Sequence, residues 1–183
     1  CEPLGPDNPL IVSGGFLTAT CASATSRTHF MAKSPLTGLL GSSNMGGFFA
    51  PELAWAVFHH LVIKGKAKHP VYIYIHNGEI EIRDARDIWG MSVTDTQWAI
   101  REDIGDREVQ SAVIGQAGEN KVAYANVMTL IKNAAGRCGA GGVMGAKNLK
   151  AVAVHGTRKP EPADKTALKE VANWVGKVFP DSG

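Results

Sequence analysis

The sequence predicts an α+β fold. Strand-like and helix-like stretches mix along the chain without strict βα alternation, which disfavours a doubly wound sheet. The clearest strand pair, at 71–75 and 79–83, is a hairpin joined by Asn77-Gly78, a dipeptide typical of tight hairpin turns. Of the 183 residues, 44% are apolar and 20% are charged, as in soluble globular chains. This length indicates one domain with a sizeable core and a short appendix.

The first third of the chain alternates short strands with turns. The apolar run 10–12, closed by Ser-Gly-Gly, predicts a buried strand, and 27–31 is a second candidate. Proline and glycine make 34–38 a turn, and 42–47 is expected to be a glycine-rich loop. A short helix is expected over 51–59, with Pro51 near its start.

The middle third adds a helix and two strands to the hairpin. Residues 61–63 are apolar and predict a strand. Helical periodicity runs from Ser92 to Ile104, capped by Ser92 or Thr94 and ended by Gly105. The strand expected at 109–114 leads into a second glycine-rich loop at 115–120.

The last third begins with an apolar stretch at 122–127 and the most glycine-rich segment of the chain, 134–145. A last strand is expected at 151–154, and 158–162 has the composition of a linker. The helix expected at 165–179 is amphipathic. Its apolar face carries Leu168, Val171, Val175 and Val178.

Charge and cysteine content exclude several classes of protein. Nineteen basic and 17 acidic residues leave a net charge of +2, with no basic run, so no nucleic-acid partner is expected. No apolar run is long enough to span a membrane. The chain opens on Cys1 rather than Met, so its true start is expected to be missing. The cysteines, Cys1, Cys21 and Cys138, are too few and scattered for a disulfide framework, which favours a reducing, cytoplasmic setting.

Three glycine-rich loops are the candidate ligand sites: 42–47, 115–120 and 134–145. Glycine lets a backbone approach a ligand closely, so such loops bind phosphates or complete the oxygen shell of a hard cation. Arg27 and Arg137 stand beside them and offer planar donors suited to phosphate. The alternative is that the loops are tight turns and the arginines surface cations. No nucleotide-binding loop, zinc motif or nucleophile–base arrangement accompanies them, so the residues alone leave the activity open.

Taken together, the motifs resemble the amino-terminal domain of the tungsten-containing aldehyde:ferredoxin oxidoreductases. The resemblance covers residues 5–157 in family order. Its blocks are Lys33-Ser34-Pro35-Leu36-Thr37-Gly38, Ser43-Asn44-Met45-Gly46-Gly47-Phe48-Phe49, Gly65-Lys66-Ala67, Trp89-Gly90, Ile114-Gly115-x-Ala117-Gly118-Glu119-Asn120, Ala134-Ala135-Gly136-Arg137-x-Gly139 and Val143-Met144-Gly145-x-Lys147-Asn148-Leu149-Lys150.

The resemblance implies a layered sandwich of two similar α+β subdomains. It also implies a tungstopterin, in which two pterins hold tungsten or molybdenum, with Mg²⁺ bridging their phosphates. Carried over by position, Arg27 contacts a phosphate, Asn44 and Ala134 give backbone carbonyls to Mg²⁺, and Gly46 with Gly47 lies against the cofactor. Asn133 stands where the family often has arginine, and we add Arg137 as a further anion contact.

The family oxidises aldehydes to carboxylic acids and passes electrons through a [4Fe-4S] cluster to ferredoxin. The segment Met45–Glu52 is more similar to relatives that include the tungsten subunit of a benzoyl-CoA reductase. Reduction of an acyl-CoA is therefore the alternative activity. The third hypothesis is that the chain is a non-catalytic fragment that keeps the fold.

The residues of this chain include no CxxCxxxC run, so the cluster ligands and the catalytic acid and base are expected outside it. We therefore expect 1–157 to be the cofactor-binding domain, and 158–183 to be a linker and the start of a helical domain. Expected partners are the remaining domains of the same subunit and ferredoxin or an iron–sulfur subunit, within a homodimer or hetero-oligomer.

Overall fold

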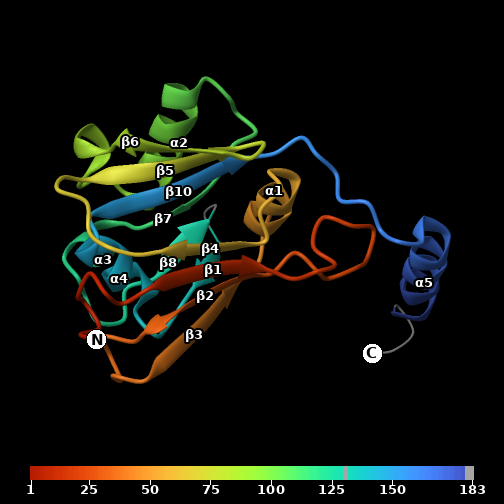
Figure 1. Ribbon diagram of the computed structural model, residues 1–183, viewed down its shortest axis with the longest axis horizontal. Coiled ribbons are helices and arrows are strands. Elements are labelled where there is room, and N and C mark those ends of the chain that lie inside the picture. Colours follow the sequence, from red (N-terminus) through yellow and green to blue (C-terminus); the bar gives the residue numbers. More distant parts are fainter. Residues whose placement is uncertain (130–131, 180–183) are drawn as a thin grey trace.

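A computed structural model, which describes residues 1–129 and 132–179, confirms the α+β fold. The strands form two sheets, one of four strands in the order β3-β2-β1-β4 and one of six in the order β6-β5-β10-β7-β8-β9. Figure 1 shows the two sheets as layers, with α2 on the outer face of the six-stranded sheet. The strands are β1 Leu10–Gly14, β2 Thr28–Lys33, β3 Leu40–Met45, β4 His60–Ile63, β5 Val71–His76, β6 Glu79–Asp84, β7 Gln110–Val113, β8 Val127–Thr129, β9 Asn133–Ala135 and β10 Leu149–His155.

The four-stranded sheet is antiparallel, and only one of its faces is buried. Along β2 the side chains alternate between buried and partly exposed, and along β3 between exposed and buried. The buried face contributes Leu10, Val12, Phe30 and Met45 to the core. The opposite face, which we call the open face, is therefore available for a ligand or another part of the protein.

The six-stranded sheet is mixed and is built around β10. This strand is parallel to β5 and antiparallel to β7, and all its residues except His155 are buried, as expected for a central strand. The β5–β6 hairpin forms as predicted. Asn77 and Gly78 have φ of 46° and 97°, the positive values that a type I′ turn needs.

Five helices are found in the described residues: α1 Phe49–Trp55, α2 Val93–Ile104, α3 Gln116–Glu119, α4 Ala140–Ala146 and α5 Lys165–Val178. Helix α2 has the predicted ends. The Ser92 side chain accepts a hydrogen bond from the Asp95 backbone N–H, and Gly105 adopts the left-handed conformation at φ 75°. None of the described helices is long and apolar enough to cross a membrane.

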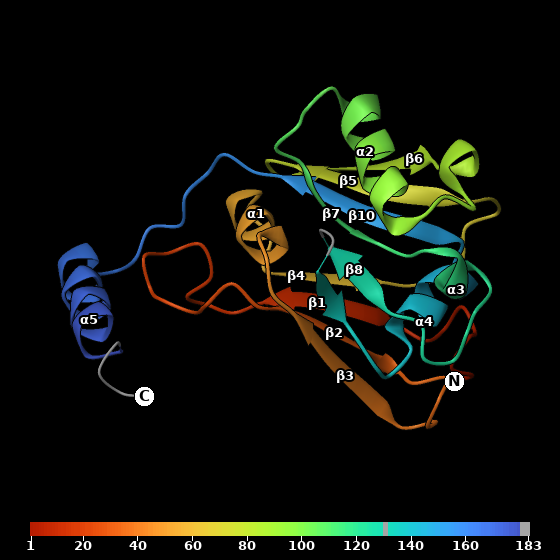
Figure 2. The same cartoon turned by 180° about the vertical axis from the view of Figure 1, so that it is seen from behind.

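Helix α5 stands apart from the two sheets. It follows an extended segment over 158–164 and lies near the loop that precedes β2, as both ribbon views show (Figures 1 and 2). None of its side chains is buried, and Trp174 keeps 62% of its surface exposed. The domain boundary predicted near 157 agrees with this arrangement but stays a prediction.

Several predicted loops and boundaries were wrong. Residues 42–45 belong to strand β3 rather than to a loop, and the helix predicted over 51–59 ends at Trp55. The loop predicted at 115–120 contains helix α3, and 134–145 contains the end of β9 and all of α4. Glycine was taken as a sign of loop structure, yet in α3 and α4 it allows two helices to pack backbone to backbone.

Candidate functional site

The predicted site residues gather where the edges of the two sheets meet. Strand β3 is one edge of the four-stranded sheet, and β9 is one edge of the six-stranded sheet. In Figure 2 the residues from β9 to the start of α4 come alongside β2 and β3. Edge strands carry backbone N–H and C=O groups that no neighbouring strand satisfies. Where the edge strands β3 and β9 lie side by side, several backbone carbonyl oxygens without a strand partner are therefore close together.

Three contacts show that β3 and the segment 133–138 run antiparallel. The Ser43 hydroxyl donates to the Gly136 carbonyl at 2.6 Å. The Cys138 thiol lies 3.4 Å from the Ser42 carbonyl. At the other end, the Asn133 side chain packs against Gly47. Asn44 and Ala134 both lie between these contacts, so the structure brings the two predicted cation ligands into the same short stretch.

The backbone of Asn44 faces outward from the sheet. The Ser34 N–H donates to the Leu39 carbonyl at 2.8 Å, which fixes the hydrogen-bonded pairs in the β2–β3 ladder. Because such pairs alternate in antiparallel strands, the pair His29↔Asn44 is a non-hydrogen-bonded one. The Asn44 carbonyl therefore points away from β2, on the same side as the Ser42 carbonyl that meets Cys138.

Gly46 and Gly47 make the bend that leads from β3 into α1. Gly47 has φ of 100°, and a Cβ there would lie 2.9 Å from the Asn133 amide nitrogen. A side chain at Gly46 would meet only the Asn133 amide oxygen, at 3.7 Å. The bend is thus closed by Asn133 at Gly47 and open at Gly46, which leaves Gly46 as the position that a ligand can approach.

Arg27 lies at the same end of the open face. It directly precedes β2, and since Thr28 pairs with Met45, the next position in register places Arg27 opposite Gly46. Its side chain is exposed and forms no ion pair within the described part of the chain. An unpaired guanidinium beside an open glycine bend is suited to bind an anion.

Arg137 stands in a strained turn next to β3. Arg137, Cys138 and Gly139 have φ of 59°, 55° and 73°, so two side-chain-bearing residues adopt the left-handed conformation in succession. Each such residue costs about 1–3 kcal/mol and persists only where the surroundings impose it. Here a Cβ on Gly139 would lie 2.1 Å from the Ala123 carbonyl oxygen, so the turn is pressed against the backbone.

The open face has no negative charge of its own. None of the four strands contains Asp or Glu. One row of residues crosses the sheet opposite Asn44, and its members are His60, Ser13 and His29. The His29 ring nitrogen Nε2 lies 2.6 Å from the Ser42 hydroxyl. The sequence reasoning missed His29 and Ser42, because only the strand register reveals that they neighbour Asn44.

This donor set fits a phosphorylated ligand held with a hard cation. Exposed cationic and hydroxyl groups surround the glycine bend without a competing carboxylate, and outward backbone carbonyls suit Mg²⁺. Within residues 1–129 and 132–179, no group of three or more His, Cys, Asp or Glu side chains could hold a metal ion. The oxygens that remain for a cation at this edge are those of the backbone, of neutral side chains such as Asn44, and of the ligand itself.

The other glycine-rich segments serve packing instead. A Cβ on Gly145 would lie 1.9 Å from the Gly118 carbonyl oxygen, so α3 and α4 touch backbone to backbone. Beside them, Lys150 and Glu119 form a buried ion pair with side-chain exposures of 0% and 5%. Glu119 also accepts the Gly90 N–H at 2.9 Å. The expected ligand loop at 115–120 is therefore a structural element.

Helix α1, which follows the bend, is fixed to the end of β10 by a buried carboxylate. Glu52 accepts the Gly156 backbone N–H at 2.9 Å, and its carboxylate lies 3.6 Å from His155 Nδ1. Burial raises the pKa of Glu52, while the Gly156 hydrogen bond and His155 act in the opposite direction. This contact anchors the helix that carries Gly46 and Gly47 at its start.

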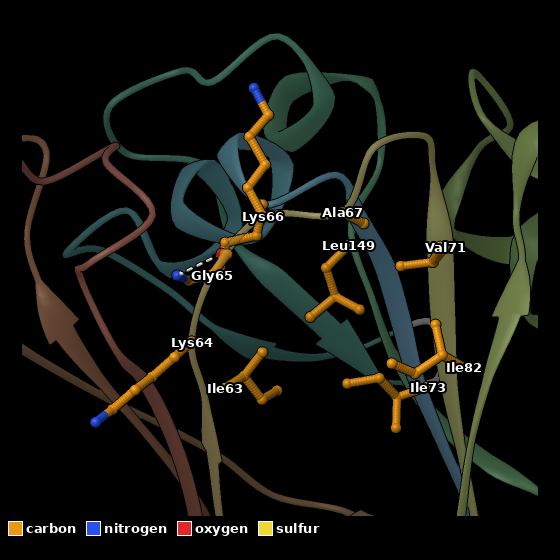
Figure 3. A pocket seen from close by; sticks show the side chains of 10 residues that line it. Ile63, Lys64, Gly65, Lys66, Ala67, Val71, Ile73, Ile82 and Leu149 are labelled. Carbon is orange, nitrogen blue, oxygen red and sulfur yellow. Dashed lines mark hydrogen bonds between the residues drawn. The ribbon is translucent and has the colours of Figure 1, made fainter.

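A separate pocket lies between the sheets, at the side where β4 and β6 are the edges (Figure 3). Its apolar lining includes Ile73, Ile82 and Leu149. Lys64 and Lys66 line its rim, but their side chains point away from the apolar residues in Figure 3. The Lys147 ammonium also lines the pocket, but it already donates to the Pro6 and Gly65 carbonyls at 3.1 Å, so it offers a ligand little and this pocket is not the candidate site.

Comparisons with known proteins agree with the motifs. A family model described as "Aldehyde ferredoxin oxidoreductase, N-terminal domain" matches residues 1–156. The chain is 49% identical over 170 residues to a tungsten-containing aldehyde ferredoxin oxidoreductase of Pyrococcus abyssi. It is 38% identical over 181 residues to an aliphatic sulfonate oxidoreductase, WOR-like subunit, of Pyrococcus furiosus. These alignments cover 93% and 92% of this chain but only 28% and 29% of the relatives.

A solved structure has nearly the same fold. It is a chain of the active-site complex BamBC of benzoyl coenzyme A reductase, bound to 1,5-dienoyl-CoA. The TM-score is 0.96 at 39% sequence identity, and the match covers 99% of this chain and 28% of that one. The chain thus spans under a third of the length of the relatives that it matches.

Proposed function

Since the chain belongs to the aldehyde ferredoxin oxidoreductase family, as its N-terminal domain, we propose that it binds the tungstopterin of an enzyme oxidising aldehydes to carboxylic acids. The 49% identity to a tungsten-containing relative favours this activity. The observation that carries the proposal is the meeting of β3 and β9, which brings Asn44 and Ala134 together beside Arg27. The resemblance to the family implies a cofactor-binding role for these positions.

The residues of this chain hold and orient the cofactor. The backbone carbonyls of Asn44 and Ala134 would bind the Mg²⁺ that bridges the pterin phosphates, and Arg27 would neutralise phosphate charge. Gly46 leaves room for close approach, and Arg137 would supply a further cationic contact. Asn133 is shorter than the arginine common in the family and is packed against Gly47, so it would provide a neutral hydrogen bond. When bound, tungsten or molybdenum supplies the oxidation–reduction chemistry.

The rest of the reaction is assigned to parts of the protein outside this chain. We propose that a [4Fe-4S] cluster held by later domains carries electrons to ferredoxin or to an iron–sulfur subunit, in a homodimer or hetero-oligomer. Residues 1–157 would be the cofactor-binding domain, and 158–183 the linker and start of the next domain. We place the enzyme in the cytoplasm, where its three free cysteines would stay reduced.

The first experiment measures tungsten and molybdenum in the complete subunit and in its Arg27→Ala variant. We expect tungsten bound to the wild-type subunit and reduced content in the variant, because a charge-assisted hydrogen bond of about 1.5–3 kcal/mol is lost. Unchanged metal content in the variant would contradict the site. A metal-free wild-type subunit, prepared with tungstate present, would instead favour the non-catalytic reading.

The second candidate activity is reduction of an aromatic acyl-CoA, as in the benzoyl coenzyme A reductase complex that shares this fold at a TM-score of 0.96. Aldehyde-dependent reduction of a viologen dye by the complete enzyme separates the two. Dye reduction with aldehydes supports the main proposal. No turnover with aldehydes, together with oxidation of a dienoyl-CoA, supports the second.

A further inference from the structure

We propose that His29 is an additional ligand-contacting residue of the open face, which donates a hydrogen bond to a phosphate oxygen of the bound cofactor. This inference rests on the proposed function, because that function supplies the phosphate. It adds a residue that the motifs do not include. Three features of the structure carry it: the position of the ring, its attachment to Ser42 and the charge of the surrounding face.

The strand register places His29 next to the proposed cation site. His29 pairs with Asn44, and in a non-hydrogen-bonded pair the two Cα atoms are about 4.5 Å apart with side chains on the same face. The ring therefore shares the open face with the Asn44 side chain. Arg27, two residues earlier, lies on the same strand end, so two nitrogen donors flank the glycine bend.

The ring is held at one nitrogen and free at the other. Nε2 lies 2.6 Å from the hydroxyl of Ser42, whose strand also carries Asn44. Nδ1 has no hydrogen-bond partner within the described part of the chain. When the Ser42 hydroxyl donates to Nε2, the ring proton is on Nδ1, which can donate it in a hydrogen bond. A ring fixed in this way loses less side-chain entropy when a ligand binds than a free surface histidine would.

The surroundings favour an anion over a cation at this nitrogen. The four strands contain no carboxylate, and the neighbours of His29 across the sheet are Ser13 and Asn44. A phosphate here gains hydrogen bonds without facing a fixed negative charge.

The test compares cofactor retention in full-length variants at positions 29 and 69. The readouts are tungsten per polypeptide, pterin fluorescence after oxidative release, and the rate of cofactor loss during gel filtration. We expect His29→Leu to lose cofactor about tenfold faster than wild type, as for a lost hydrogen bond to a charged group. His29→Gln keeps a donor and should retain at least half of the wild-type tungsten content. His69→Leu is the control for the same substitution outside the open face, where His69 is exposed and His29 is partly buried.

The outcomes separate this proposal from the proposed function. Rapid loss in His29→Leu, with near-normal retention in His29→Gln and His69→Leu, supports the role of His29. If His29→Leu retains tungsten while Arg27→Ala does not, the role of His29 is wrong and the proposed function stands. If both variants retain tungsten, the site itself is wrong. Equal loss in His29→Leu and His29→Gln, or an equal drop in their thermal midpoints, would indicate a structural role and overturn the proposal.

Discussion

Two glycine-rich regions of this chain look alike in sequence and behave differently in the structure. Around Gly46 and in 133–138, small residues line the meeting of two sheet edges, and a side chain at Gly46 would have room. Around Gly118 and Gly145, small residues let two helices touch, and a side chain would strike a backbone oxygen. Glycine in the first region leaves space for a ligand, whereas in the second region the protein itself fills that space.

The largest expected effect comes from the buried ion pair beside the packed glycines. Lys150→Met leaves the Glu119 carboxylate buried without its cation. Breaking a buried pair by removing one partner costs about 3–5 kcal/mol. We expect a clear drop in the thermal midpoint of the full-length protein, and faster hydrogen exchange in α3 and at Gly90, whose N–H donates to Glu119. A thermal midpoint and exchange pattern equal to those of wild type would show that the pair is not needed for packing.

A matched pair of alanine substitutions tests the comparison directly. Gly145→Ala places a Cβ against the Gly118 carbonyl oxygen, and overpacking of this kind costs about 1–3 kcal/mol. Gly46→Ala meets only the tip of the Asn133 side chain, so its effect on stability should be within about 0.5 kcal/mol.

Thermal unfolding and tungsten content are measured for both alanine variants. We expect Gly145→Ala to lower the thermal midpoint, and Gly46→Ala to lower cofactor retention at a nearly unchanged midpoint. If Gly145→Ala lowers only cofactor retention and Gly46→Ala lowers the thermal midpoint, the assignment of the first region to ligand binding and the second to packing is wrong.

The smallest expected effect concerns Glu52, a buried carboxylate whose close neighbours are the Gly156 N–H and the His155 ring. Burial raises its pKa above the ordinary 4.5. Protonated Glu52 is therefore favoured in the folded state, so its contribution to stability is complete below pH 4.5 and is lost as the pH rises through the raised pKa. Glu52→Gln keeps an acceptor for the Gly156 N–H and removes this loss.

The measurement for Glu52 is the thermal midpoint between pH 4 and 8 for wild type and Glu52→Gln. The thermal midpoint of Glu52→Gln should rise relative to that of wild type as the pH rises. Glu52→Leu, which leaves the Gly156 N–H unpaired, serves as the contrast and should be less stable throughout. A constant difference between wild type and Glu52→Gln across this range would contradict the role assigned to burial.

Local signals in the sequence predicted most of the regular structure. A continuous apolar run located β1, alternation located β5 and β6, and Asn77-Gly78 predicted the hairpin, because these patterns depend on near neighbours in the chain. Ser92 and Gly105 marked both ends of α2 for the same reason. The predictions failed at α3, α4 and the end of β3, where contacts distant in sequence override the local preference of glycine and serine for loops.

By itself, the sequence determined the α+β class and the family, since composition, periodicity and ordered motifs are properties of the chain, and it predicts the residues of the cofactor motif. Only the tertiary structure decided which glycines border open space and which face another helix, because that choice depends on what lies opposite each one. It also decided that β3 and β9 meet as unpaired edges, and that His29 neighbours Asn44. Because the sequence analysis took 42–47 for a loop, it had no strand β3 whose register with β2 it could predict.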